Sequence, residues 1–96
     1  MAKILIVEDS PTNMKLTSLL LRNAGHSVLS ASDAETGLAL ARSEHPDLVL
    51  MDIHLPGMDG LEATSILKGD PATTSIPVIA LTALAMTTDQ ERTRSA

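Results

Sequence analysis

The sequence contains no cysteine and no aromatic residue, and each absence narrows what the chain can be. Without cysteine there can be no disulfide and no thiolate metal site, a composition that fits a reducing compartment. Without Phe, Tyr or Trp, the core must be built from aliphatic side chains and five methionines, which bury less area than aromatic side chains do. We therefore expect one small domain of modest stability in these 96 residues.

Positive charge is also scarce. The 12 acidic residues outnumber the 7 lysines and arginines, which gives a formal net charge of -5. A negative chain repels nucleic acid phosphates and favours metal ions or cationic partners, so nucleic acid binding is not expected. The amino terminus, MAKILIVED, has an apolar run of only four residues, too short for a signal peptide or a membrane span. We expect no membrane contact and a cytoplasmic location.

Short apolar runs predict the strands of a parallel sheet. Three of them, at 4–7, 48–51 and 78–81, are bounded by polar or turn residues, as in strands buried on both faces. A less apolar run at 26–31 suits a strand at the sheet edge. Helical patterns follow each strand, so a strand and a helix alternate four times. This order specifies an α/β fold, a doubly wound parallel sheet with helices on both faces.

Capping residues locate the helices. Ser10 and Pro11 can begin the first helix, which Gly25 ends. Ser32 and Glu35 form a capping box for the second helix.

Later helices are expected from residue 60 to about 68 and from about residue 88 onward. In the first helix, helical spacing predicts a stripe that faces the sheet. Its members are Leu16, Leu19, Leu20 and Ala24, whereas Met14 and Leu21 lie off the stripe and suggest a second buried face.

Polar side chains follow three of the predicted strands. Glu8 and Asp9 come directly after the first, Asp52 follows the run at 48–51, and Thr82 follows the run at 78–81. Because parallel strands end at one edge of their sheet, these side chains should converge there. A lone acid after a strand most often caps a turn. Three carboxylates together repel one another, and such a cluster either holds protons or binds a cation.

The chemistry that fits this cluster is phosphoryl transfer onto Asp52. Hard divalent cations take oxygen ligands, and Mg²⁺ in particular binds through one or two carboxylates together with waters and phosphate oxygens. A carboxylate can act as the nucleophile and form an aspartyl phosphate while the cation offsets the charge of the transferring group. The Thr82 hydroxyl could bond a phosphoryl oxygen.

These segments resemble the receiver domain of bacterial two-component response regulators of the chemotaxis-regulator type. The resemblance rests on VED after the first strand, LVLMDIHLPGMDG around Asp52, and PVIALTA around Thr82. It implies a flavodoxin-like sheet with strand order 2-1-3-4 for the four strands present. Pro56 and Gly57 would shape the loop after the acceptor.

The same resemblance implies roles for individual residues. Asp52 would be phosphorylated by a sensor histidine kinase or a histidine phosphotransfer protein, and Thr82 would be the switch hydroxyl. Glu8 and Asp9 would form the acid pocket. Asp9, Asp52 and the backbone carbonyl of His54 would bind Mg²⁺, with Glu8 acting through a water molecule. Such a domain is a phosphorelay switch and not an enzyme, although it takes part in its own phosphotransfer and dephosphorylation.

The sequence also departs from this family. The family pattern continues into a fifth strand, which carries a lysine, and a fifth helix, so residues 1–96 are expected to form a C-terminally incomplete receiver domain. Lys3, Lys15 and Lys68 are not expected to replace that lysine. The strand at 78–81 would then lie at an edge, where an oligomer or a domain swap could cover it.

Other functions stay open at this point. A receiver-like interaction module could bind partners without phosphorylation, and an inactive fragment would do neither. A phosphatase with an aspartyl intermediate shares the nucleophile after a strand. That class usually carries a second acid two residues later, where this chain has His54, so it is disfavoured.

Overall fold

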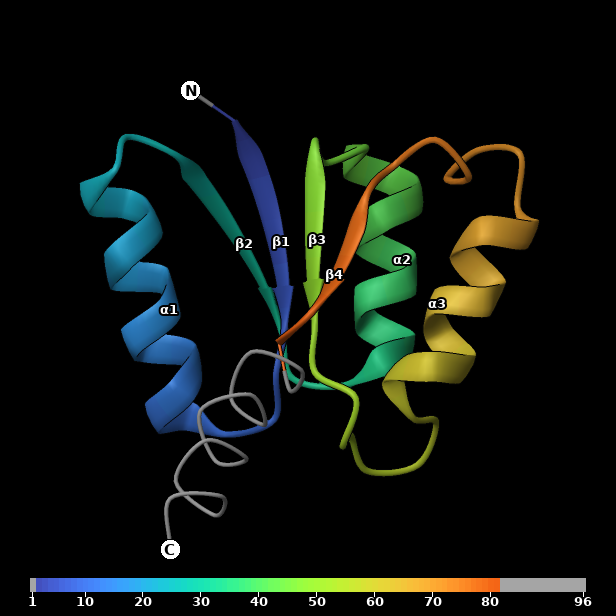
Figure 1. Ribbon diagram of the computed structural model, residues 1–96, viewed down its shortest axis with the longest axis horizontal. Helices are drawn as coiled ribbons and strands as arrows, with labels where there is room; N and C mark the ends of the chain where they lie inside the picture. Colours follow the sequence, from blue (N-terminus) through green and yellow to red (C-terminus); the bar gives the residue numbers. More distant parts are fainter. Residues whose placement is uncertain (1, 82–96) are drawn as a thin grey trace, which may run out of the picture.

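The computed structural model describes residues 2–81, in which strands and helices alternate (Figure 1). The elements are β1 (Lys3–Val7), α1 (Pro11–Asn23), β2 (Ser27–Ala31), α2 (Ala34–Glu44), β3 (Leu48–Met51), α3 (Gly60–Gly69) and β4 (Val78–Ala80). Strand β4 ends one residue before the predicted boundary. The helix predicted from about residue 88 lies outside the described residues.

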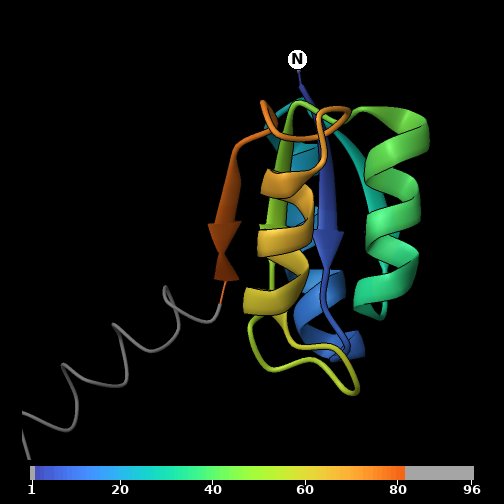
Figure 2. The same cartoon turned by 90° about the vertical axis from the view of Figure 1, so that its right-hand side faces the viewer.

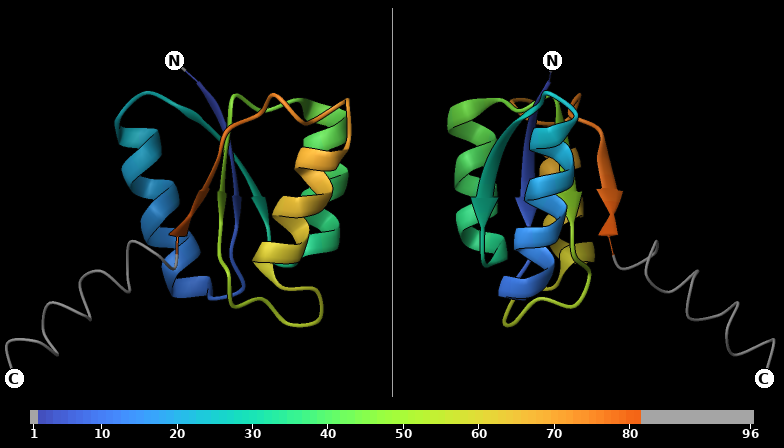
Figure 3. Two further views of the ribbon diagram at one scale, coloured as in Figure 1. Left: turned by 45° about the vertical axis from the view of Figure 1, so that its right-hand side comes forward. Right: turned by 90° about the vertical axis from the view of Figure 1, so that its left-hand side faces the viewer.

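The four strands form one parallel sheet in the order β2-β1-β3-β4. This order confirms the prediction from the sequence, including the edge position of β2. Helix α1 covers one face of the sheet, and α2 and α3 cover the other (Figures 2 and 3). Each strand-to-strand connection therefore crosses over through a helix, as parallel pairing requires.

The core has two layers, one on each face of the sheet. In β1, Leu5 and Val7 belong to the larger cluster beneath α2 and α3, whereas Ile4 and Ile6 belong to the smaller cluster beneath α1. Successive side chains of a strand point to opposite faces, so a strand between two helical layers must be apolar at every position. This requirement explains why the apolar runs of β1 and β3 are unbroken.

Helix α1 packs through a different side from the one that the sequence predicts. Leu16, Leu19 and Leu20 are 56%, 54% and 62% exposed. Met14 and Leu21 instead pack partly buried against the smaller cluster. Met14, Ser18 and Leu21 follow one another at helical spacing, and Ser18 is buried, so a small side chain lies where the helix meets the sheet. The predicted stripe, Ala24 included, is therefore wrong.

The helix caps agree with the sequence in one case and differ in the other. Ser10 caps α1, with its hydroxyl accepting a hydrogen bond from the Asn13 N–H. The cap of α2 is Asp33 rather than Ser32, and its carboxylate accepts a 2.7 Å bond from the Thr36 N–H. A carboxylate accepts a stronger, charge-assisted hydrogen bond than a hydroxyl does, so the helix begins after Asp33 rather than after Ser32.

None of the helices within residues 2–81 is long and apolar enough to cross a lipid bilayer.

Candidate functional site

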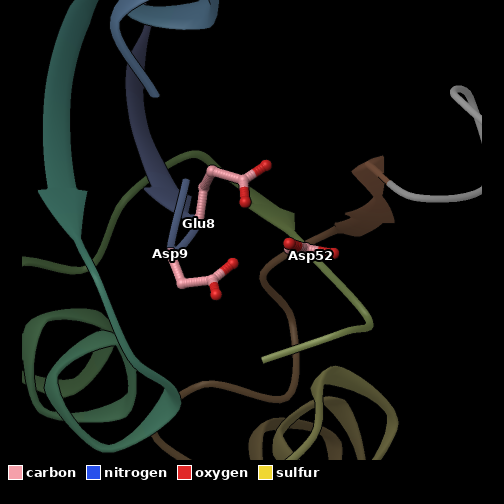
Figure 4. Close-up of side chains that lie close together, drawn as sticks. All are labelled: Glu8, Asp9 and Asp52. Carbon is pink, nitrogen blue, oxygen red and sulfur yellow. The ribbon is translucent and has the colours of Figure 1, made fainter. Parts of the chain in front are cut away.

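Carboxylates from two adjacent strands meet at the carboxyl end of the sheet. Val7 is paired with Met51 across β1 and β3, so the residues that follow them emerge side by side. The Asp52 N–H donates a 2.9 Å hydrogen bond to the Val7 carbonyl, which continues this pairing beyond β3. Glu8, Asp9 and Asp52 each offer a carboxylate oxygen, and these oxygens all lie within 4.8 Å of one another (Figure 4). The convergence expected from the sequence is observed for these three residues.

The three carboxylates differ in their access to water. Asp9 is exposed, whereas Glu8 and Asp52 are only 6% and 8% exposed. Burial and a hydrogen bond to Asp52 raise the pKa of Glu8 to about 7, with the nearby negative charge of Asp52 adding to the effect. The Ser10 N–H, which donates to Glu8 Oε2 at 3.2 Å, opposes this rise. Near neutral pH the Glu8 carboxyl is therefore protonated in a large fraction of the molecules when no cation is present.

Backbone contacts of the loop after β3 orient Asp52. The His54 N–H donates a 3.0 Å hydrogen bond to Asp52 Oδ1, so the position of one carboxylate oxygen is fixed by the chain that follows it. The Gly60 N–H donates to the Ile53 carbonyl at 2.9 Å and closes the loop. The buried side chain of Leu55 anchors the loop to the core. Asp52 is thus held in place before any ligand arrives.

Gly60 lies against this loop more tightly than the sequence indicated. A Cβ at position 60 would overlap the Asp52 carbonyl oxygen and would lie 2.8 Å from the Ile53 Cα. Only glycine allows the start of α3 to approach the acceptor residue this closely. The sequence alone predicts only that a helix begins at this residue. The sequence offered one indication of this close approach. Gly60 stands at the first position of the helix, directly after Asp59, and the start of a helix does not itself require glycine.

Gly57 has φ +75°, in the left-handed region that glycine adopts without strain. This conformation agrees with the predicted role of Gly57 in shaping the loop after Asp52.

The remaining candidates of the sequence analysis lie at different places. The side chain of His54 is exposed, and its backbone N–H contacts Asp52. Thr82 lies outside the described residues. The Lys3 ammonium donates to the Glu44 carbonyl, and the Lys68 ammonium donates to carbonyls that precede β4. Neither lysine is bonded to the acidic cluster, as the sequence predicts.

The donor set suits a hard divalent cation. Carboxylate oxygens are the ligands that Mg²⁺ and Ca²⁺ prefer, and a site with one exposed and two buried carboxylates leaves room for waters or phosphate oxygens. A cation would also favour the ionised form of Glu8 and relieve its repulsion with Asp52. The chemistry of the residues present thus fits a magnesium ion.

Comparison with known proteins identifies the family. The model of the response regulator receiver domain matches residues 4–96. The chain is also 52% identical over 91 residues to the protein PilH of Pseudomonas aeruginosa, covering 95% of this chain and 72% of PilH. The chain belongs to the response regulator receiver domain family.

Solved receiver domains share the fold. The receiver domain of the sensor histidine kinase PA1611 from P. aeruginosa is 36% identical, with a TM-score of 0.82 over 94% of this chain and 74% of that one. That structure has a magnesium ion coordinated in its active site cleft. The N-terminal domain of a response regulator receiver protein from Methanoculleus marisnigri is 38% identical, with a TM-score of 0.79, and the match covers 81% of this chain. The chain spans 63% of that structure.

Membership of this family explains the placement of the acids. Receiver domains are signalling switches whose general function is to accept a phosphoryl group, and they bind magnesium at an acidic pocket. The flavodoxin-like order of the strands brings the ends of β1 and β3 together, and the acidic cluster of this receiver domain lies there. The predicted family and fold are therefore confirmed.

Proposed function

We propose that this receiver domain, residues 1–96, is a phosphoacceptor switch of a two-component system and that Asp52 is the residue phosphorylated. The observation that carries the proposal is the placement of Asp52. Its carboxylate is oriented by the His54 N–H and lies within 4.8 Å of two further acids at the ligand-binding edge of the sheet. A capping role does not require a buried acid beside two others.

The transfer would form an acyl phosphate. A carboxylate oxygen of Asp52 attacks the phosphorus of a phosphohistidine, the P–N bond breaks as the O–P bond forms, and the imidazole leaves with the electron pair and takes a proton. The donor is a sensor histidine kinase or a histidine phosphotransfer protein. Dephosphorylation by water would return the carboxylate to its starting state, so the domain takes part in its own reset.

A magnesium ion would be held by Asp9, Asp52 and the backbone carbonyl of His54, with Glu8 bound through a water molecule. When bound, Mg²⁺ offsets the charge of the transferring phosphoryl oxygens. The carboxylates of Asp9 and Asp52 would position the ion, and Glu8 lies buried beside them. Thr82 is proposed as the switch hydroxyl that bonds a phosphoryl oxygen. A cytoplasmic location remains a prediction from composition.

A small-molecule phosphodonor tests this assignment without a kinase. We expect incubation with acetyl phosphate and Mg²⁺ to add one phosphoryl group, visible by intact mass and lost on treatment with hydroxylamine. Asp52→Asn should abolish the addition, and removal of Mg²⁺ with EDTA should reduce it at least about tenfold, because the charge of the donor is no longer offset. Asp33→Asn serves as the control, since asparagine also caps a helix well.

Labelling of Asp52→Asn equal to the wild type would refute the choice of acceptor. Absence of labelling in the wild type, together with partner binding that Asp52→Asn leaves unchanged, would favour an interaction module that works without phosphorylation.

A further inference from the structure

Backbone atoms of two different elements hold the residue proposed as the phosphoacceptor. On one side, the Asp52 N–H donates a 2.9 Å hydrogen bond to the Val7 carbonyl at the end of β1. On the other side lies Gly60, the first residue of α3, where a Cβ would overlap the Asp52 carbonyl oxygen and lie 2.8 Å from the Ile53 Cα. These neighbours are backbone atoms, which cannot swing aside as the end of a flexible side chain can. The first turn of α3 therefore limits where the backbone of residues 52 and 53 can lie.

One peptide unit connects this turn to the carboxylate of Asp52. The Ile53 carbonyl accepts a 2.9 Å hydrogen bond from the Gly60 N–H. The N–H of the same peptide unit, which belongs to His54, donates a 3.0 Å hydrogen bond to Asp52 Oδ1. Because a peptide unit is planar and rigid, a rotation that displaces its carbonyl also displaces its N–H. A change in the position of the Ile53 carbonyl relative to Gly60 therefore changes the hydrogen bond that orients the acceptor.

Helix α3 cannot easily move back to make room for a side chain at position 60. Ala63 and Leu67 on this helix are fully buried in the larger core cluster. The Asp59 carboxylate caps the first turn by accepting a 2.8 Å hydrogen bond from the Glu62 N–H. Since a close-packed core resists displacement of the helix, an added methyl group would instead displace the loop that carries Asp52.

We propose that Gly60 is a positioning residue for phosphoryl transfer to Asp52. The absence of a side chain at position 60 lets α3 hold the peptide unit between residues 53 and 54 in the orientation in which its N–H bonds Asp52 Oδ1. The inference rests on the proposed function, because it concerns the same acceptor. A glycine needed only for packing would affect stability without changing the orientation of the Asp52 carboxylate, so experiment can separate the two roles.

The NMR signal of the His54 amide reports the orientation of the acceptor without any phosphodonor. Asp52→Ala removes the acceptor of this hydrogen bond and gives the reference signal of the amide without it. We expect Gly60→Ala to move the His54 signal in the same direction as Asp52→Ala does. Leu67→Ala is the matched control, because it destabilises the buried side of the same helix and leaves Gly60 in place. Its His54 signal should stay at the wild-type position.

The rate of labelling by acetyl phosphate in the presence of Mg²⁺ measures the effect on phosphoryl transfer. Gly60→Ala should be labelled at least about tenfold more slowly than the wild type, because a displacement of the nucleophile by about 1 Å can slow a reaction this much or more. The loss should lie in the maximal rate and not in the donor concentration that gives half of it, since Gly60 acts through Asp52. Leu67→Ala, in a sample whose NMR spectrum shows it folded, should be labelled like the wild type.

A second pair of variants loosens the first turn of α3 without adding an atom, and it decides the question if Gly60→Ala does not fold. Asp59→Ala removes the cap of that turn and should move the His54 signal and slow labelling about threefold or more. Asp33→Ala removes the equivalent cap of α2 and should change neither.

A His54 signal that stays in place in both Gly60→Ala and Asp59→Ala would overturn the positioning role. Labelling of Gly60→Ala at the wild-type rate would also overturn it, and so would an equal slowing in Leu67→Ala, which would reduce the effect to stability. A wild type that acetyl phosphate fails to label would overturn the proposed function and with it the role of Gly60 in phosphoryl transfer. The His54 signal would then still decide whether Gly60 orients Asp52.

Discussion

At the scale of single residues, Glu8 has the clearest electrostatic signature. It is buried, hydrogen-bonded to Asp52 and surrounded by like charge, and these effects raise its pKa from 4.5 to about 7. The folded protein therefore binds a proton at this carboxyl more tightly than the unfolded chain does. Stability gained from that proton is present at low pH and is lost as the pH rises through about 7.

We predict that, in EDTA, the free energy of unfolding of the wild type falls between pH 5 and pH 8 more steeply than that of Glu8→Gln. Glutamine keeps the size of the side chain and removes the titration. Urea denaturation at a series of pH values measures the difference, with Glu35→Gln on the solvent side of α2 as the control. Parallel pH profiles for wild type and Glu8→Gln would contradict the shifted pKa.

Gly60 gives a second prediction at this scale. Gly60→Ala should reduce stability by about 1 to 3 kcal/mol, because the added methyl group overlaps the backbone of residues 52 and 53. Gly69→Ala, at the other end of α3, meets no atom within 4 Å and should be neutral or stabilising by up to about 1 kcal/mol. Urea denaturation compares the two. A similar effect of both substitutions would show that the close approach is easily relieved.

At the scale of elements, α1 shows how a helix can carry two apolar stripes. One stripe, with Met14 and Leu21, packs on the sheet, and the other, with Leu16, Leu19 and Leu20, lies on the solvent side. Spacing alone gives both stripes the same period and does not tell which one is buried. The exposed leucines are thus available to contact another molecule, whereas the buried stripe fixes the helix to the sheet.

The two stripes should respond differently to substitution. Leu20→Ala should change stability by no more than about 0.5 kcal/mol, since Leu20 is 62% exposed. Leu21→Ala should cost roughly 1 to 2 kcal/mol, because Leu21 packs partly buried against the smaller core cluster. Both variants keep a good helix former, so thermal or urea unfolding compares packing alone. A larger loss for Leu20→Ala would favour the packing first predicted from the sequence.

At the scale of the whole molecule, β4 lies at the end of the described sheet. Within residues 2–81 it pairs with β3 alone, and Ile79 is 45% exposed on it. A strand with an unpaired edge and an exposed apolar side chain tends to recruit another chain.

We predict that the protein self-associates through the edge of β4 and that Ile79→Lys weakens this association at least about tenfold, because a charged side chain blocks edge pairing. Size-exclusion chromatography with light scattering over a range of concentrations measures the mass. Leu61→Lys, at an equally apolar and 62% exposed position of α3, is the control and should associate like the wild type. A wild-type chain that stays monomeric at every concentration would contradict the prediction.

Some features of the structure could be predicted from the sequence and others could not, and the difference has physical causes. Local patterns were sufficient for β1 and β3, because a strand between two helical layers must be apolar at each position, and this leaves a continuous apolar run in the sequence. The order of the strands and the meeting of Glu8, Asp9 and Asp52 followed from the rule that parallel strands end at one edge. The cap of α2 was displaced by one residue, since Ser32 and Asp33 are both good caps and the carboxylate of Asp33 accepts the stronger, charge-assisted bond.

The sequence by itself determined the fold class, the family and the three acids of the site, because each depends on residue type and on position relative to a strand end. Only the tertiary structure decided which side of α1 meets the sheet, how closely Gly60 approaches Asp52, and that a cavity adjoins Glu8 and Asp9. These features depend on distances between segments far apart in the chain. Local periodicity carries no information about such distances, since they are set by how the helices pack on the sheet.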